Sequence, residues 1–312
     1  MAEFRTRTGS PEAAATEPVP ELLAVPTTAT TGGRPRRPPL QPATVFLGIG
    51  LALFTLGYLA PVIGVVYTSI RTDADIAREG LWALSNDLTV RNYLEVWFAG
   101  NARRYLWNTL VVTVPATVFS ITLGSLCGYV FAKLRPAGGE LIYVIVVAGL
   151  FVPPQILLVP LFRMFNTAGV YDTLWPMIIV HTAYGISVCT LVMRNFFSQV
   201  PNELRESAIV DGAAEPIVLW RIMLPLSRPA LAALATLQFT WIWNDFLYPL
   251  VFTRSDSMRT VMVGVLALQG QYSVAYGAQA AMSVLASIPT LAVFLIFQKQ
   301  FIQGLAAGAV KG

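Results

Sequence analysis

Three long stretches of this chain contain no charged residue. They run from Leu40 to Ile70, from Tyr105 to Ala132 and from Thr260 to Gln298. A helix needs about 20 apolar residues to cross the hydrocarbon core of a bilayer, and each stretch is longer than that. Charged residues make up only 12% of the chain, about half their share in a soluble domain. The sequence therefore predicts an all-α, polytopic membrane protein.

Six transmembrane helices account for the apolar pattern. The third is the weakest because Pro153, Pro154 and Pro160 interrupt it. Proline removes a backbone donor and kinks a helix, and such breaks persist in membranes where protein or a water-filled cavity satisfies the freed backbone. The kink therefore has two interpretations, a packing feature or part of a translocation path. The predicted spans cover roughly residues 43–70, 105–132, 141–162, 173–193, 229–253 and 277–298.

The basic residues predict the orientation of these spans. Lys and Arg accumulate on the cytoplasmic side of a membrane, and an even number of spans puts both chain ends on one side. With the ends inside, the cytoplasmic segments carry more of the basic residues than the external segments do. We therefore expect a multi-pass protein of the cell (inner, cytoplasmic) membrane with both termini in the cytoplasm.

The two ends of the chain differ in composition from its middle. Residues 1–42 are rich in Pro, Thr, Ala and Glu and contain few large apolar residues, a composition typical of disorder. They are expected to form a disordered cytoplasmic tail, and 299–312 a second cytoplasmic tail, around a transmembrane domain over 43–312. The net charge of +4 is explained by arginines near lipid headgroups, and we expect no binding of nucleic acid.

The chain contains no spacing typical of a metal site or a disulfide framework. Cys127 and Cys189 fall within the second and fourth predicted spans, and His181, the single histidine, lies in the fourth. An ionisable group inside a membrane is a candidate for function, but a neutral imidazole that hydrogen-bonds a neighbouring helix is the simpler interpretation. No catalytic group, metal or cofactor is expected on this chain.

A polar segment at residues 200–228 separates the fourth and fifth predicted spans. On a helix that starts near Pro201, the residues Leu204, Ala208, Asp211 and Gly212 share one face. The small residues on this face would let another surface approach closely, and the glycine can end the helix in a left-handed conformation. A helix that only touches lipid and a solvated connector are the alternatives. Neither requires small residues there, so the segment favours protein docking.

A second short helix is expected after this turn. Pro216 suits its first turn, apolar residues dominate from Ile217 to Leu224, and Pro225 is expected to break it. The two short helices would lie near the inner membrane surface.

This segment resembles the coupling-loop motif of ABC importer permeases, Glu-Ala-Ala-(three residues)-Gly-(nine residues)-Ile-x-Leu-Pro. Ser207 stands at the second position of the motif, a small-for-small change. The surrounding sequence looks like the carbohydrate-uptake, maltose-permease-like branch, and the resemblance runs from about residue 43 to the C-terminus. It is carried by Glu206, Ser207, Ala208, Asp211, Gly212, Ile222, Met223, Leu224 and Pro225, by Trp243-Asn244-Asp245-Phe246 and by the run from Gly304 to Gly312.

The resemblance implies a type I ABC importer permease fold with a cytoplasmic coupling helix. It implies a second, different permease as heterodimer partner, two copies of an ABC ATPase subunit, and an extracytoplasmic binding protein that delivers a sugar. ATP and Mg²⁺ would bind the partner ATPase, since this chain has no Walker-type phosphate loop, and this subunit would be non-catalytic. The implied ATPase-coupling residues are Glu206, Ser207, Ala208, Asp211, Gly212, Ile222, Leu224 and Pro225.

The expected function is therefore ATP-driven import of a mono- or oligosaccharide through this permease. Trp243, Asn244 and Asp245 are candidates for the substrate path because the last two are polar inside a predicted span, although a helix–helix hydrogen bond explains them equally. The segment 254–279 is expected to be a polar external loop that contacts the binding protein or lies in an interfacial aromatic belt. The alternatives are a permease for another solute class, an ion-gradient-driven secondary carrier, and an assembly subunit without transport.

Overall fold

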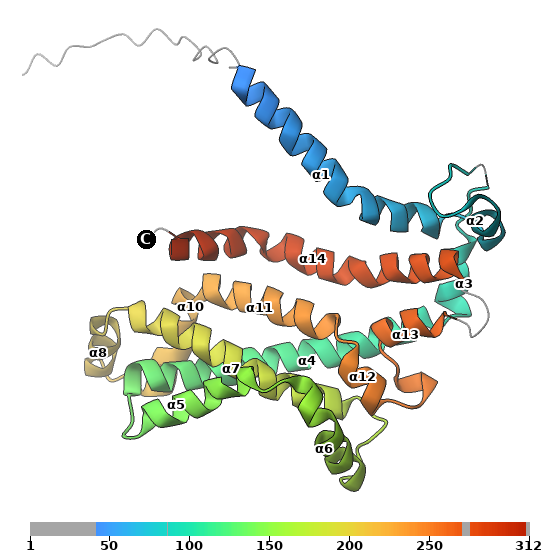
Figure 1. Ribbon diagram of the computed structural model, residues 1–312. Helices are drawn as coiled ribbons and strands as arrows, with labels where there is room; N and C mark the ends of the chain where they lie inside the picture. The colour runs from blue at the N-terminus through green and yellow to red at the C-terminus, as the bar shows by residue number, and fades with distance from the viewer. Residues whose placement is uncertain (1–41, 86, 270–274, 310–312) are drawn as a thin grey trace, which may run out of the picture. The chain divides into compact units, whose positions relative to one another are not determined.

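The computed structural model describes residues 42–85, 87–269 and 275–309. The expected disordered tail, 1–42, lies outside the described residues except for Pro42. The chain divides into two compact units, Met1–Thr55 and Leu56–Gly312. Of the first unit the structure describes only the beginning of α1, and the remaining helices belong to the second. All regular elements in the described ranges are helices (Figure 1).

Four helices are long and apolar enough to cross a membrane. Two further candidate spans are helix pairs with a sharp bend, so the total reaches six if each bent pair is one span. The long helices are α1 (Pro42–Ser69), α4 (Ala102–Tyr129, continued by η1, Val130–Leu134), α7 (Trp175–Gln199) and α14 (Tyr276–Ala309). The first bent pair joins α5 (Gly139–Ala148) and η2 (Gly149–Phe151) to α6 (Pro154–Thr167) at 98°, and the second joins the helix Glu215–Leu226 to α11 (Arg228–Trp243) at 79°.

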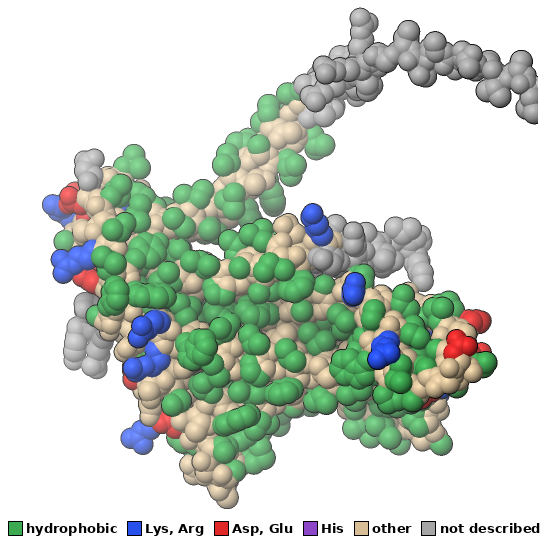
Figure 2. All heavy atoms as spheres, turned by 180° about the vertical axis from the view of Figure 1, so that it is seen from behind, with side chains coloured by type: hydrophobic (Ala, Val, Ile, Leu, Met, Phe, Trp, Pro, Cys, Tyr) green, Lys and Arg blue, Asp and Glu red, His purple; other side chains and the backbone are tan. Residues whose placement is uncertain are grey.

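Shorter helices connect these spans at the two ends of the second unit. One end carries α8 (Glu203–Val210), α9 (Glu215–Val218), η3 (Leu219–Met223) and α10 (Leu224–Leu226). The other carries α2 (Asp73–Glu79), α3 (Arg91–Phe98), α12 (Leu247–Phe252), η4 (Asp256–Met258) and α13 (Val261–Ala267). Charged side chains gather near these ends in Figure 2, with a mostly hydrophobic surface between them, as expected for a protein surrounded by lipid.

The predicted fifth span, roughly 229–253, is not one continuous helix. Helix α11 ends at Trp243, and α12 starts again at Leu247. The Asn244 side chain donates to the Thr240 carbonyl oxygen at 2.8 Å, and the Asp245 carboxylate accepts from the backbone N–H of Leu247 at 3.1 Å. Short polar side chains that bond the nearby backbone in this way compete with the helical pattern, and they explain the break.

The segment 254–279 also differs from the predicted polar loop. Helix α13 lies within it, and Val261 is fully buried. The carboxylate of Asp256 accepts from the Tyr105 hydroxyl at 2.6 Å and from Arg259 at 2.9 Å, which fixes the start of the segment on α4. Tyr276 opens α14 and is exposed. Gln271 and Tyr272 of this segment lie outside the described residues.

Helices α4 and α7 pack side by side at very close range. A β-carbon added at Gly124 of α4 would lie 2.2 Å from the Cβ of Cys189, and one added at Gly185 of α7 would lie 2.1 Å from the Ser120 hydroxyl oxygen. Small residues let transmembrane helices approach until their backbones are in contact. The glycines therefore determine the packing of these two spans.

Replacing Gly124 with valine is expected to destabilise the protein by about 1–3 kcal/mol, because a side chain forced into a filled interface pushes the helices apart. The matched control is Gly57→Val in α1, where an added β-carbon meets no atom within 4 Å. The melting temperature of the detergent-purified protein checks this. Equal melting temperatures for the two variants would contradict the packing role of Gly124.

Candidate functional site

Helix α8 ends in a turn that needs a glycine. Its last residue is Val210, and Gly212 has a φ of +87°, in the left-handed region that favours glycine. The N–H of Gly212 donates to the Ile209 carbonyl oxygen and that of Ala213 to the Ala208 carbonyl oxygen, both at 2.9 Å. These two bonds satisfy the last carbonyl groups of the helix. The prediction that Gly212 ends the helix in a left-handed conformation is confirmed.

Of the predicted docking face, Ala208 points inward, whereas Leu204, Asp211 and Gly212 are exposed as expected. Ala208 is half-buried and packs against a core cluster that includes Tyr129, Phe197 and Val218. It therefore faces the chain's own core, whereas the predicted close approach at Ala208 requires an outward face. The exposed residues of α8 and its turn are Glu203, Leu204, Glu206, Ser207, Ile209, Val210, Asp211 and Gly212.

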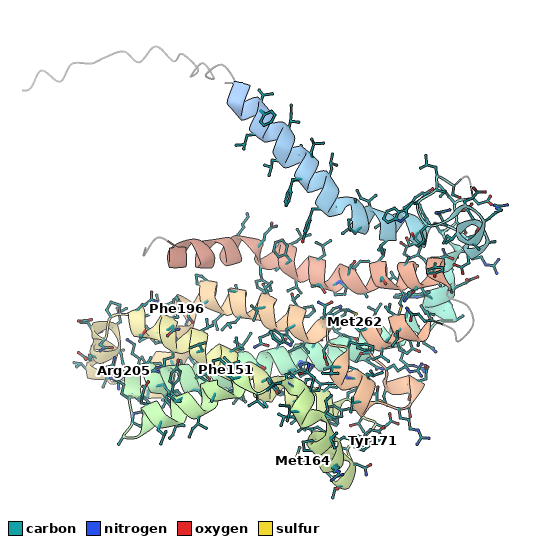
Figure 3. All side chains as sticks on the ribbon, viewed as in Figure 1. Phe151, Met164, Tyr171, Phe196, Arg205 and Met262 are labelled. Carbon is teal, nitrogen blue, oxygen red and sulfur yellow. The ribbon has the colours of Figure 1, made fainter. Side chains whose placement is uncertain are left out.

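Three side chains tie α8 to the rest of the second unit. Arg205 on α8 forms an ion pair with Glu215 on α9, with a distance of 3.2 Å from its Nε to Oε2 and a closer contact from NH2 to Oε1. The Tyr129 hydroxyl of α4 donates to the same Oε2 at 2.6 Å. The hydrogen bond to Glu215 raises the pKa of the Arg205 guanidinium. Figure 3 shows Arg205 at the end of the helical unit where α8 lies.

A lysine of the second span supports the beginning of α8. The Lys133 ammonium donates to the Val200 carbonyl oxygen at 2.5 Å and to Asn202 Oδ1 at 2.8 Å. It thereby binds the chain just before Glu203, the first residue of α8. The beginning of the short helix is thus held by Tyr129 of α4, Lys133 of η1 and Glu215 of α9.

The second short helix continues past the proline that was expected to break it. Pro225 lies within α10, and the helical path ends at Leu226 before the 79° bend. The preceding turn η3 is a π-helix, in which the Leu224 N–H donates to the Leu219 carbonyl oxygen. A widened turn of this kind accommodates a proline, which has no backbone N–H to donate. Pro225 therefore belongs to the helix rather than to its end.

The apolar face of this helix packs against the spans. Val218 and Met223 are fully buried, and Leu219 is buried beside them. Ile222 and Leu224 of the predicted coupling set are half-buried against the same core cluster. The helix from Glu215 to Leu226 thus joins the exposed α8 to α4, α7 and α11.

The three predicted substrate-path residues lie at the break after α11 but have different surroundings. Trp243 is buried, donates its indole N–H to the Ala286 carbonyl oxygen of α14 at 2.8 Å, and stacks on Phe239. Asn244 is exposed. Asp245 Oδ2 lies 3.2 Å from the Nε2 of His181 on α7, in agreement with a histidine that hydrogen-bonds a neighbouring segment.

Sequence reasoning missed the ion pair that holds α8 in place. Arg205 and Glu215 are ten residues apart, and a residue separation says nothing of contact until the turn at Gly212 is known. One feature of the sequence could have indicated this ion pair: Arg205 and Glu215 carry opposite charges and lie on either side of the predicted sharp turn. Within the described part of the chain, no group of three His, Cys, Asp or Glu residues could hold a metal ion.

A family model supplies the decisive comparison. Residues 120–307, more than half of the chain, match the binding-protein-dependent transport system inner membrane component. The chain belongs to this family. It is the permease subunit of a binding-protein-dependent ABC importer, a multi-pass inner membrane protein and a non-catalytic subunit. The predicted resemblance to ABC importer permeases is confirmed, and an ion-gradient-driven secondary carrier is excluded.

Similar proteins cover nearly the whole permease. A probable ABC transporter permease of Pyrococcus horikoshii is 32% identical, over 87% of this chain and 98% of its own length. An arabinooligosaccharides transport system permease of Halalkalibacterium halodurans is 31% identical, over 85% of this chain and 96% of its own. A solved chain of a bacterial ABC transporter that imports the acidic polysaccharide alginate matches with a TM-score of 0.72 at 22% identity, over 85% of this chain and 100% of that chain. This likeness confirms the predicted all-α permease fold.

Proposed function

We propose that this permease imports a mono- or oligosaccharide that an extracytoplasmic binding protein delivers. The observation that carries the proposal is the similarity, over nearly the full length of both chains, to a permease named for arabinooligosaccharide transport. The carbohydrate-type sequence around the coupling motif supports the same substrate class. A permease for another solute class is the alternative.

The proposed complex contains a second, different permease and two copies of an ABC ATPase. Both termini and the coupling loop 200–228 would lie in the cytoplasm, with tails at 1–42 and 299–312 around the permease domain. The exposed residues Glu206, Ser207, Asp211 and Gly212 would contact one ATPase subunit. ATP binding on the ATPases can shift the permease between two states only if they bind those states with different affinity.

The inward-facing residues of the coupling set would act by holding the docked helix. Ala208, Ile222 and Leu224 pack against the core of the spans, and Pro225 lies in the helix that leads into α11. A movement of α8 would therefore reach the spans through packed side chains. In the substrate path, the exposed Asn244 is the candidate contact, and the bonds of Trp243 and Asp245 would hold the break in place.

A detergent pull-down of the tagged chain at native expression, with uptake assays on labelled arabinotriose, maltose and cellobiose, tests the proposal. We expect recovery of a second permease and an ATPase subunit, and ATP-dependent uptake of at least one sugar that is lost when the chain is deleted. Recovery of the complex with uptake only of a non-sugar solute would overturn the substrate class. Recovery of the chain alone under conditions that preserve complexes would contradict the proposed assembly.

A further inference from the structure

A cavity of about 120 Å³ lies where the bend between α5 and α6 meets α7 and α11. Its polar lining consists of His181 and Tyr184 from α7 and Gln238 from α11, and Trp241 lies at its edge. We propose that this cavity holds one sugar ring during translocation, with hydrogen bonds between the sugar hydroxyl groups and these three side chains. The inference rests on the proposed sugar substrate.

The cavity combines an apolar wall with a few converging polar groups, as small-molecule sites do. The rest of its lining is aliphatic or glycine and comes from the α5–α6 bend, α7 and α11. His181 is 4% exposed and Gln238 is 5% exposed, so both side chains are largely enclosed by the chain. Its volume is far above the ~10–15 Å³ that a single water needs on the same measure, and it suits one ring rather than a whole oligosaccharide.

The polar groups are only partly used within the chain. The Gln238 amide N–H donates to the Gly185 carbonyl oxygen at 3.3 Å, and the Tyr184 hydroxyl donates to the Val152 carbonyl oxygen at 3.1 Å. Within the described part of the chain, no hydrogen bond engages Gln238 Oε1 or His181 Nδ1. Neither atom is among the fully buried, unpartnered polar atoms of the described residues, so each is open to a donor in the cavity. Sugar hydroxyl groups supply such donors.

The bend beside the cavity argues against a lipid-facing role. The chain turns by 98° between Phe151 and Pro154, and Val152 is extended. Non-helical backbone at membrane depth persists only where protein or a water-filled cavity covers it, and polar groups inside spans face the bundle or an aqueous path. Figure 3 shows Phe151 at this bend. Because Leu150, Val152 and Pro154 of this bend line the cavity, the translocation-path interpretation of the proline kink is favoured over packing alone.

The open side of the cavity offers a surface for a sugar ring. Trp241 is 66% exposed and the neighbouring Leu237 is 45% exposed, so the cavity reaches the surface of the chain along α11. An indole face provides a rigid apolar platform for the C–H face of a ring. Its hydroxyl groups can then point to Gln238 and Tyr184.

The test uses the complete transporter with its binding protein and the labelled sugar that the wild type takes up. Gln238→Leu removes the free acceptor, and Tyr184→Phe removes a hydroxyl without changing the ring. Each is expected to lower sugar uptake about tenfold, the effect of one hydrogen bond to the substrate. The matched control is Thr236→Val on the same helix, whose hydroxyl bonds only the Ala232 carbonyl oxygen of its own helix; its uptake should stay within about twofold of wild type.

Discrimination between sugars separates binding from a structural role. The wild-type transporter is expected to take up the parent sugar faster than analogues that lack one hydroxyl group. In Gln238→Leu or Tyr184→Phe, at least one of these analogues should be taken up as fast as the parent sugar. Unchanged uptake and unchanged discrimination in both variants would overturn the cavity assignment and leave the sugar importer standing. Absence of any sugar uptake by the wild-type transporter would overturn the proposed function and the ring site together.

Discussion

Replacing Gly212 with aspartate is expected to abolish uptake while the permease still inserts into the membrane at its normal level. A β-carbon added at this residue meets no atom of the chain within 4 Å, and its φ is +87°. Within the chain alone the change therefore costs only the strain of a left-handed residue, about 1–2 kcal/mol. The larger loss would come from a charged side chain placed on the surface that docks to the ATPase. Uptake and membrane accumulation are measured side by side.

Two further substitutions distinguish a requirement for positive φ at Gly212 from a requirement for close contact with the ATPase. Asparagine adopts positive φ more readily than alanine does. If the backbone alone matters, Gly212→Asn should transport nearly as wild type and Gly212→Ala less well. If a partner surface approaches this glycine closely, both variants lose uptake. Normal uptake in Gly212→Asp would overturn the coupling role of the turn.

The turn at Gly212 was predictable because its cause is local. A glycine at the end of a short helical pattern is a common helix terminus, and the structure has it there. The same holds for the four long spans, since the absence of charge over more than 20 residues is a property of the segment itself. Local sequence therefore sufficed for the spans and the end of α8.

Features that depend on contacts between segments were not predictable in this way. Helical periodicity places Leu204, Ala208 and Asp211 on one face, but it does not say which of them contact the chain's own core; Ala208 is half-buried, and the other two are exposed. Ala208 points to the core because Arg205, one turn earlier, is bound by Glu215. The closeness of α4 and α7 likewise depends on which residue faces Gly124, and only the folded chain shows that it is Cys189.

The break after α11 shows a limit of predicting helix ends from hydropathy. A hydropathy window extends the fifth span through Asn244 and Asp245 because apolar residues lie on both sides. The helix ends there because these two side chains bond the backbone around them. Similarly, Pro225 appeared to be a helix end because the π-helical turn that accommodates it has no sequence signature.

Replacing Glu215 with alanine is expected to lower uptake about 10- to 100-fold without preventing insertion. The Glu215 carboxylate accepts hydrogen bonds from Arg205 on α8 and Tyr129 on α4, so it joins the docking helix to a span. Hydrogen bonds to charged groups contribute about 1.5–3 kcal/mol each when buried. Because the Glu215 side chain is 34% exposed, solvent weakens both bonds, and we expect about 1.4–2.8 kcal/mol from the two together, where 1.4 kcal/mol corresponds to a tenfold change. Without Glu215, α8 can move with the ATPases while the spans do not follow. ATP hydrolysis would continue, and transport would fall.

The pairing itself is tested by exchanging the two charges. Arg205→Glu and Glu215→Arg should each lose uptake, because each single change places like charges together in a half-buried position. The double variant restores an ion pair and is expected to recover part of the uptake. Glu79→Gln is the matched control, since its side chain is half exposed on α2 and its contact with Arg78 is at 3.8 Å. A double variant no better than the single variants would show that these residues act separately, and the link from α8 to the spans would then rest on the apolar contacts of Ala208 and the helix that follows it.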